Sequence, residues 1–217
     1  MIVGERKPFD EIKESTKDLK KVLLLGCGSC VSVCMAGGEK EVELLASQLR
    51  IANKLEGKEL TISEDTVERQ CDREYIEPII ALTKDCDAIV SMACGAGVQF
   101  AAEMLEPLPV IPALNTLFIG VTEAEGAWSE RCRACGDCTL ASYGGICPVT
   151  ICAKGLHNGP CGGSSLGKCE AGNNKDCAWE LIYRRLKQQG QLDNLKTFAT
   201  PRDYKLQAHP VSLVKEL

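Results

Sequence analysis

The chain has 217 residues, a formal net charge of −5 and an apolar content of 45%. This length suits one large domain or two small ones, and the apolar content supports a buried core. The acidic balance, with a pI near 5.3, argues against a general nucleic-acid surface, which needs a basic face. We therefore expect no nucleic-acid partner.

The 14 cysteines are the most informative residues, because they fall in close-spaced groups. Thiolates two or three residues apart converge readily on one metal centre, whereas disulfides seldom join cysteines so close in sequence. We interpret the groups as metal ligands. Two groups open with the spacings CxxCxxxC and CxxCxxC, at Cys27, Cys30 and Cys34 and at Cys132, Cys135 and Cys138.

The cellular compartment suggested by the sequence agrees with this interpretation. No long apolar stretch follows a basic start at the first residues, as a signal peptide would require. The apolar run at residues 22–25 is far shorter than the ~20 residues of a membrane helix. We expect a cytoplasmic protein without a membrane span, in which thiols stay reduced.

The first half of the chain alternates between strand and helix patterns. Residues 1–20 are polar and predict an arm, and the run at 22–25 predicts a strand covered on both faces. A helix follows at 39–56, where Gly57 is a plausible stop. Such alternation predicts an α/β fold with an open, mostly parallel, Rossmann-like sheet over residues 1–125. Further strands are expected at 59–62, 87–92, 108–111 and 117–121, and further helices at 75–82, where Pro78 marks a start or a kink, and at 98–105.

Ligand sites in such sheets lie at the carboxyl ends of strands, near a topological switch point. Cys27 and Cys94 both fall at predicted strand ends. We therefore expect one [4Fe–4S] cluster on Cys27, Cys30, Cys34 and Cys94. Cys71 is the competing fourth ligand or a buried thiol, and Cys86, at the amino end of its strand, is expected to be structural.

Glycines surround the first cysteine, which raises the alternative of a nucleotide site. The third glycine of GxGxxG would fall at position 31, which is Val31, so the dinucleotide fingerprint fails. We expect instead that Gly26, Gly28 and Gly95 let backbone amides approach the cluster.

Residues 126–217 form a second predicted module, with eight cysteines between 132 and 177 and little periodic apolar pattern. Metal, in place of a large core, is expected to organise it. Eight thiolates suit two four-cysteine sites, so the chain would hold two or three [4Fe–4S] clusters, with zinc as the alternative at one C-terminal site. A helix is expected at about 178–189, and residues 197–217 predict a disordered tail or a docking arm. By analogy with ferredoxins, one site would use Cys132, Cys135, Cys138 and Cys177, and the other Cys147, Cys152, Cys161 and Cys169.

Several short motifs together resemble those of a known protein family. The chain carries GCGSC at 26–30, ACGAGVQ at 93–99, PALNT at 112–116, NGPCGG at 158–163 and CAW at 177–179. In these motifs the chain resembles the small iron–sulfur subunit of anaerobic methylenetetrahydrofolate reductase, from about residue 1 to 210.

The resemblance implies a role in electron transfer. In that family a separate flavin-containing catalytic subunit reduces methylenetetrahydrofolate, and the small subunit is thought to supply electrons from ferredoxin or another electron-transfer complex. The sequence agrees, since it shows no nucleophile motif or phosphate loop. Two alternatives stay open: a zinc-stabilised structural partner subunit, or an enzyme that binds substrate at its own cluster.

Overall fold

The computed structural model describes residues 1–172 and 174–215, and the chain divides into two compact units, Met1–Ser129 and Glu130–Leu217. Within the described residues, no helix combines the length and the apolar character that crossing a bilayer requires. Each unit has a hydrophobic cluster of its own.

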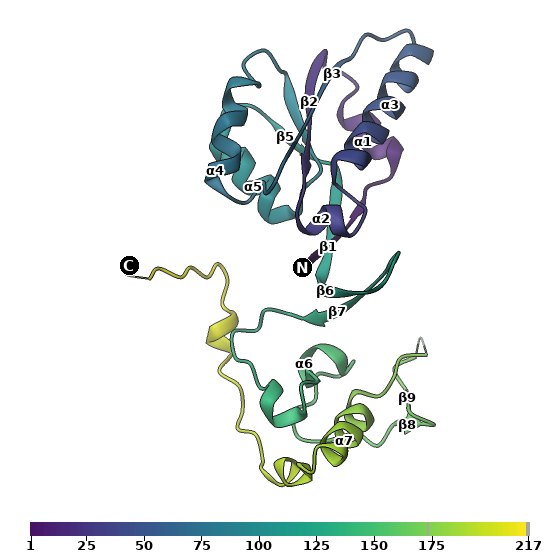
Figure 1. Cartoon of the computed structure of the whole chain (residues 1–217), viewed down its shortest axis with the longest axis vertical. Coiled ribbons are helices and arrows are strands. Elements are labelled where there is room, and N and C mark those ends of the chain that lie inside the picture. The colour runs from purple at the N-terminus through teal and green to yellow at the C-terminus, as the bar shows by residue number, and fades with distance from the viewer. Residues whose placement is uncertain (173, 216–217) are drawn as a thin grey trace. The chain divides into compact units, whose positions relative to one another are not determined.

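A four-stranded parallel sheet forms the centre of the N-terminal unit (Figure 1). Its strand order is β3-β2-β4-β5, so the chain moves from β2 to one side and then returns to the other. This order confirms the predicted open, parallel α/β sheet. The strands are β2 (Lys21–Cys27), β3 (Thr61–Val67), β4 (Ala88–Ser91) and β5 (Val110–Pro112).

The apolar run in β2 places buried side chains on both faces of this sheet. Val22 and Leu24 pack in one hydrophobic cluster, whereas Leu23 and Leu25 pack in another. Because successive side chains of a strand point to opposite faces, a continuous apolar run is what a sheet covered on both sides needs. Helices α1 (Phe9–Ser15) and α3 (Glu39–Leu55) lie on one side and α4 (Arg73–Ile76) and α5 (Gly95–Met104) on the other (Figure 1).

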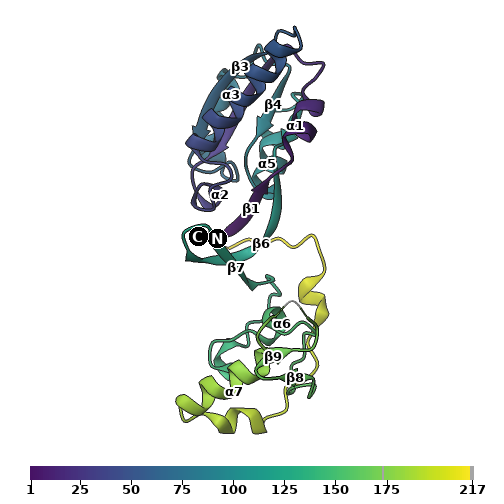
Figure 2. The same cartoon turned by 90° about the vertical axis from the view of Figure 1, so that its right-hand side faces the viewer.

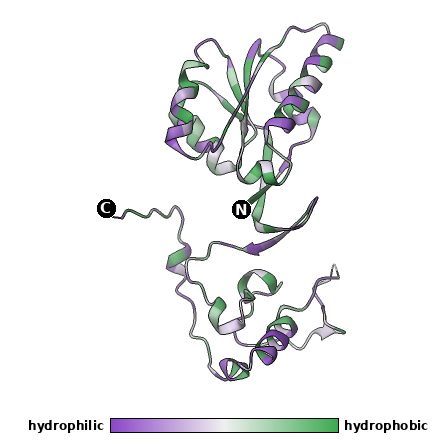
Figure 3. Ribbon diagram, in the orientation of Figure 1, coloured by the Kyte–Doolittle hydropathy of each residue, from purple (hydrophilic) through white to green (hydrophobic). Residues whose placement is uncertain are grey.

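Helix α3 confirms the helix predicted from periodicity. Val42, Leu45 and Leu49 are buried at helical spacing, and hydrophobic and hydrophilic residues alternate along the ribbon (Figure 3). Gly57 follows with a φ of 68°, the left-handed conformation that ends helices.

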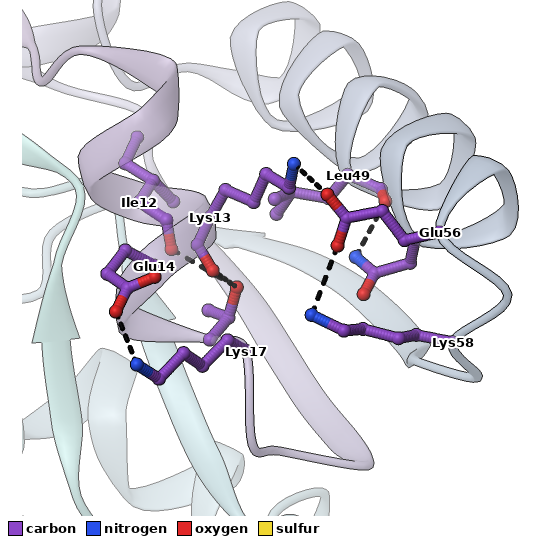
Figure 4. Close-up of polar contacts among 9 residues, drawn as sticks. Ile12, Lys13, Glu14, Lys17, Leu49, Glu56 and Lys58 are labelled. Atoms are coloured by element: carbon purple, nitrogen blue, oxygen red, sulfur yellow. Dashed lines mark hydrogen bonds and ion pairs between the residues drawn. The ribbon is translucent and has the colours of Figure 1, made fainter.

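Ion pairs connect α1 to the end of α3 (Figure 4). Lys13 of α1 pairs with Glu56, the residue after α3, and Glu56 also pairs with Lys58 at 3.0 Å. These hydrogen bonds, the one from Lys13 foremost, lower the pKa of Glu56. Glu14 of α1 pairs with Lys17, two residues after the end of the helix, so this contact links α1 to no second helix or strand.

The first residues are not an arm, and the last predicted strand is not in the parallel sheet. β1 (Ile2–Arg6) pairs antiparallel with β6 (Leu114–Ala124), and with β7 (Ala127–Cys132) they form a separate sheet in the order β1-β6-β7. Figure 2 shows β1 lying along β6. The strand expected at 117–121 exists, therefore, but its partners differ, because strand patterns do not specify pairing.

Other boundaries moved by a few residues. β3 begins at Thr61 and runs to Val67, beyond the expected end at residue 62. The helix expected at 75–82 is a short α4 followed by the 3-10 helix η1 (Glu77–Ala81), with Pro78 near its start, because proline cannot donate the hydrogen bond of an uninterrupted helix. α5 begins at Gly95, directly after Cys94.

The C-terminal unit has short elements and a small core. Tyr143, Trp179, Ile182 and Leu186 are its buried cluster, and the rings of Tyr143 and Trp179 meet edge to face at 5.6 Å. Helix α7 confirms the helix expected at 178–189. The elements are η2 (Leu140–Tyr143), α6 (Pro148–Ile151), β8 (Ser164–Ser165), β9 (Lys168–Cys169), α7 (Ala178–Gln188), η3 (Leu192–Lys196) and η4 (Tyr204–Gln207).

Candidate metal centre

Cys27 and Cys94 follow the two central strands of the parallel sheet. Cys27 is the last residue of β2, and Cys94 lies three residues after the end of β4. β2 and β4 are paired in parallel, with Leu25 opposite Ser91. Because the chain leaves these strands toward opposite edges, their carboxyl ends form the switch point of the sheet. The sequence pattern predicted that both cysteines follow strand ends, and both lie at the carboxyl end of the parallel sheet.

Cys71 belongs to the same end of the sheet. Burial raises the pKa of the Cys71 thiol, and the next largest causes are its electrostatic interactions with Cys94 and Cys27. Cys71 is nonetheless exposed, whereas Cys27 is buried and Cys94 is half-buried. Three cysteines from three different loops thus lie at the same end of the sheet.

The Cys34 thiol is enclosed by backbone groups, and Cys30 is among the residues that interact with it electrostatically. Cys34 Sγ accepts a hydrogen bond from Gly4 N at 3.4 Å and lies 3.5 Å from the carbonyl oxygens of Gly4 and Val31. The residue is only 5% exposed, and burial raises the pKa of its thiol. Cys30 begins the short helix α2 (Cys30–Val33) and is half-buried. Cys86, before β4, donates to Leu82 O at 3.8 Å, and burial raises its pKa.

The three glycines of the predicted site have other roles in the structure. Gly28 N donates to Val67 O at 2.8 Å, and Gly95 N donates to Thr116 Oγ1 at 2.8 Å. A Cβ atom on Gly26 would lie 2.4 Å from Thr66 Oγ1, so close packing requires glycine there. Close packing therefore accounts for Gly26, and the amides of Gly28 and Gly95 have hydrogen-bond partners within the protein.

Gln70 is the residue that sequence reasoning missed. Its side chain is fully buried, and its Nε2 donates to the carbonyl oxygens of Leu25 at 2.8 Å and Gly26 at 3.0 Å. Its Oε1 accepts a hydrogen bond from Ser91 Oγ at 2.6 Å. A single glutamine between two charged stretches looks like a surface residue in the sequence, and no motif marks it.

The eight C-terminal cysteines lie in loops and at the ends of short elements. Cys147 and Cys177 are the residues before α6 and α7, and Cys152 follows α6. Cys152 and Cys177 contact the small core. The remaining cysteines are half-buried or exposed: Cys132, Cys135, Cys138, Cys161 and Cys169.

Cys161 of the NGPCGG motif contacts an exposed ion pair. Cys161 Sγ lies 3.6 Å from Glu170 Oε1, and Glu170 pairs with Lys154. The hydrogen bond from Lys154 lowers the pKa of Glu170. Cys161 therefore lies among exposed polar residues and outside the small core.

The residues around this motif attach the loop to the rest of the C-terminal unit. Trp179 Nε1 donates to Leu156 O at 3.0 Å, and Tyr143 Oη donates to His157 O at 2.9 Å. Asn158 forms a two-way pair with Ala199, donating to its carbonyl oxygen at 3.0 Å and accepting from its amide at 2.8 Å. Burial, followed by the positive charge of Arg202, lowers the pKa of His157. His157 contributes its backbone to this arrangement.

The cysteines suit thiolate ligation by their chemistry, since all 14 are free. Among residues 1–172 and 174–215, however, no three or more Cys, His, Asp or Glu side chains are grouped as they would be around a metal ion. Around a single tetrahedral zinc, thiolate sulfurs lie about 4 Å apart, as follows from the Zn–S length of about 2.3 Å. A four-iron cluster is also ligated by cysteine thiolates, and three loops carry thiols at this end of the sheet.

Residues 111–205 match the family described as methylene-tetrahydrofolate reductase C terminal. The C-terminal part of the chain is therefore related to that reductase. The matched stretch contains all eight cysteines of the C-terminal unit, whereas Cys27, Cys71 and Cys94 lie before it. No curated protein and no solved structure matches the chain.

Proposed function

We propose that the chain is an iron–sulfur electron-transfer subunit that supplies electrons to a flavin-containing methylenetetrahydrofolate reductase subunit. The observation that carries the proposal is the match of residues 111–205 to the reductase C-terminal family, in a stretch with eight free cysteines. Closely spaced free thiols are the ligands that iron–sulfur clusters use.

The chemistry of the reaction agrees with an electron carrier beside a flavin. Reducing methylenetetrahydrofolate to methyltetrahydrofolate takes two electrons and two protons. An iron–sulfur cluster carries one electron at a time, and a flavin accepts two in succession before passing them to the substrate. In this proposal Cys27, Cys30 and Cys94 hold a cluster in the N-terminal unit, and the cysteines from Cys132 to Cys177 hold one or two more.

Metal analysis of the full chain, purified without oxygen, tests the proposal. We expect roughly eight to twelve irons per chain, with matching acid-labile sulfide, as for two or three four-iron clusters. After reduction, electron paramagnetic resonance should show signals of reduced clusters. Stoichiometric zinc without iron would contradict the proposal and support a structural subunit.

The partner is tested with the reduced chain and a flavin-containing methylenetetrahydrofolate reductase subunit. Mixing the two without oxygen should bleach the flavin absorbance, while apo-chain prepared with a chelator should not. Methyltetrahydrofolate should form only when the flavoprotein is present. Turnover by this chain alone would instead support an enzyme that binds substrate at its own cluster.

A further inference from the structure

The contacts of Cys34 argue against its binding a cluster at the sheet end. Its thiol is enclosed between α2 and β1, where Gly4 contributes both an amide and a carbonyl within hydrogen-bond reach of sulfur. A cluster on Cys34 would require β1 to move away, although β1 is paired along its length with β6. The CxxCxxxC spacing is compatible with ligation, but the packing of its third cysteine opposes it.

The loop before Cys71 is fixed to both central strands. Gln70 bonds to the carbonyl oxygens of Leu25 and Gly26, directly before Cys27, and to the hydroxyl of Ser91 at the end of β4. A buried amide with three hydrogen bonds holds one position, because breaking them would leave polar groups without partners.

Two further sets of contacts bring the three cysteine loops together. Cys27 Sγ and Ser29 Oγ both donate to Glu68 O, at 3.8 and 2.9 Å. On the other side, a Cβ atom on Gly97 would lie 3.1 Å from the Cβ of Gln70, so the first turn of α5 packs directly on Gln70. The loop carrying Cys71 is thus packed between the loop of Cys27 and the helix that follows Cys94.

We propose that Cys71, in place of Cys34, is a ligand of the N-terminal cluster beside Cys27 and Cys94, and that Gln70 positions it. This inference rests on the proposed function, because it assigns ligands to one of the clusters. It also explains why an exposed cysteine lies beside a fully buried glutamine: the glutamine fixes the backbone while the thiol faces the site.

Matched alanine variants of the full chain, purified without oxygen, test the assignment. Cys71→Ala should lose about four irons, the content of one four-iron cluster, or change the electron paramagnetic resonance spectrum of that cluster. Cys34→Ala and the control Cys86→Ala should keep the iron content and spectrum of the unmodified chain. Circular dichroism checks that each variant is folded, and Cys71 is exposed, so its replacement should not disturb packing.

The outcomes separate the ligand assignment from the proposed function. Iron retained with an unchanged spectrum in Cys71→Ala, together with iron lost in folded Cys34→Ala, would overturn the assignment while leaving the electron-transfer role intact. An unmodified chain that contains no iron would overturn the proposed function and the assignment with it.

Discussion

Ser91 and Gln70, both fully buried, are joined by a hydrogen bond of 2.6 Å at the carboxyl end of the parallel sheet. Ser91 Oγ also accepts from Ala93 N at 3.3 Å. The two side chains therefore connect the loop before Cys71 with the loop that leads to Cys94. This pair lies at the same end of the sheet as Cys27 and Cys94.

Replacing Gln70 should disturb the N-terminal cluster more than the fold. Gln70→Met removes all three hydrogen bonds while keeping a side chain of similar size. We expect a loss of about 1–3 kcal/mol in the free energy of unfolding. We also expect a shifted reduction potential and altered electron paramagnetic resonance signals for the cluster that Cys71→Ala removes. Gln70→Glu keeps the acceptor for Ser91 but places a carboxylate oxygen against the carbonyl oxygens of Leu25 and Gly26, so we expect it to disturb the cluster signals as well. Equal stability loss with unchanged signals in both variants would mean a purely structural glutamine.

Gly37 and Gly28 should differ sharply in their tolerance of a methyl group. A Cβ atom on Gly37 would lie 1.9 Å from Met92 O, whereas on Gly28 the nearest atom is Val67 O at 3.5 Å. Gly37 O also accepts the amide of Cys27 at 2.8 Å. We expect Gly37→Ala to cost about 1–3 kcal/mol or more and to lower iron content, and Gly28→Ala to cost little. Chemical denaturation and iron analysis check both, and equal effects would contradict the close packing at Gly37.

The elements that sequence patterns predicted best are those with an unambiguous period. The continuous apolar run of β2 predicts a strand covered on both faces of a sheet. The apolar spacing of α3 predicts an amphipathic helix. β1 was missed because Ile2 and Val3 are its only large apolar residues before charged ones, and its pairing with β6 depends on residues more than 100 positions away.

That omission also affected the candidate site. Since residues 1–20 were expected to be an arm, nothing in the sequence indicated that Gly4 would cover the Cys34 thiol. Strand-end placement did predict that Cys27 and Cys94 lie at the same end of the sheet, because topology alone brings the carboxyl ends of neighbouring parallel strands together. The role of Gln70 could not be predicted, since its partners come from two strands and its burial is a property of the folded chain.

Stability should decrease at low pH through Glu56. Its carboxylate is stabilised by Lys13 and Lys58, which lowers its pKa in the folded state. This contribution is therefore present above the ordinary glutamate pKa of about 4.3 and is lost as the pH falls through the lower, folded value. Glu56→Gln should lower the melting temperature slightly at pH 7, and the difference should vanish toward pH 3.

Melting curves by circular dichroism across this pH range provide the check. Glu14→Gln is the matched control, because Glu14 pairs with Lys17 just after α1 and connects no second helix or strand. Exposed pairs are weak, so we expect a small effect that 1 M salt reduces. A Glu56→Gln difference that persists unchanged at pH 3 would contradict the ion-pair explanation.

Asn158 of the NGPCGG motif should hold the segment around residue 199 in place. Its side chain replaces a backbone partner, since it both donates to and accepts from Ala199. Asn158→Ala removes both hydrogen bonds, and Asn158→Asp keeps the acceptor but loses the donor. Hydrogen exchange should become faster at the Ala199 amide in Asn158→Ala and change less in Asn158→Asp, because only the acceptor protects that amide. Unchanged exchange at Ala199 in Asn158→Ala, measured by mass spectrometry of the folded chain, would show that other contacts fix this segment.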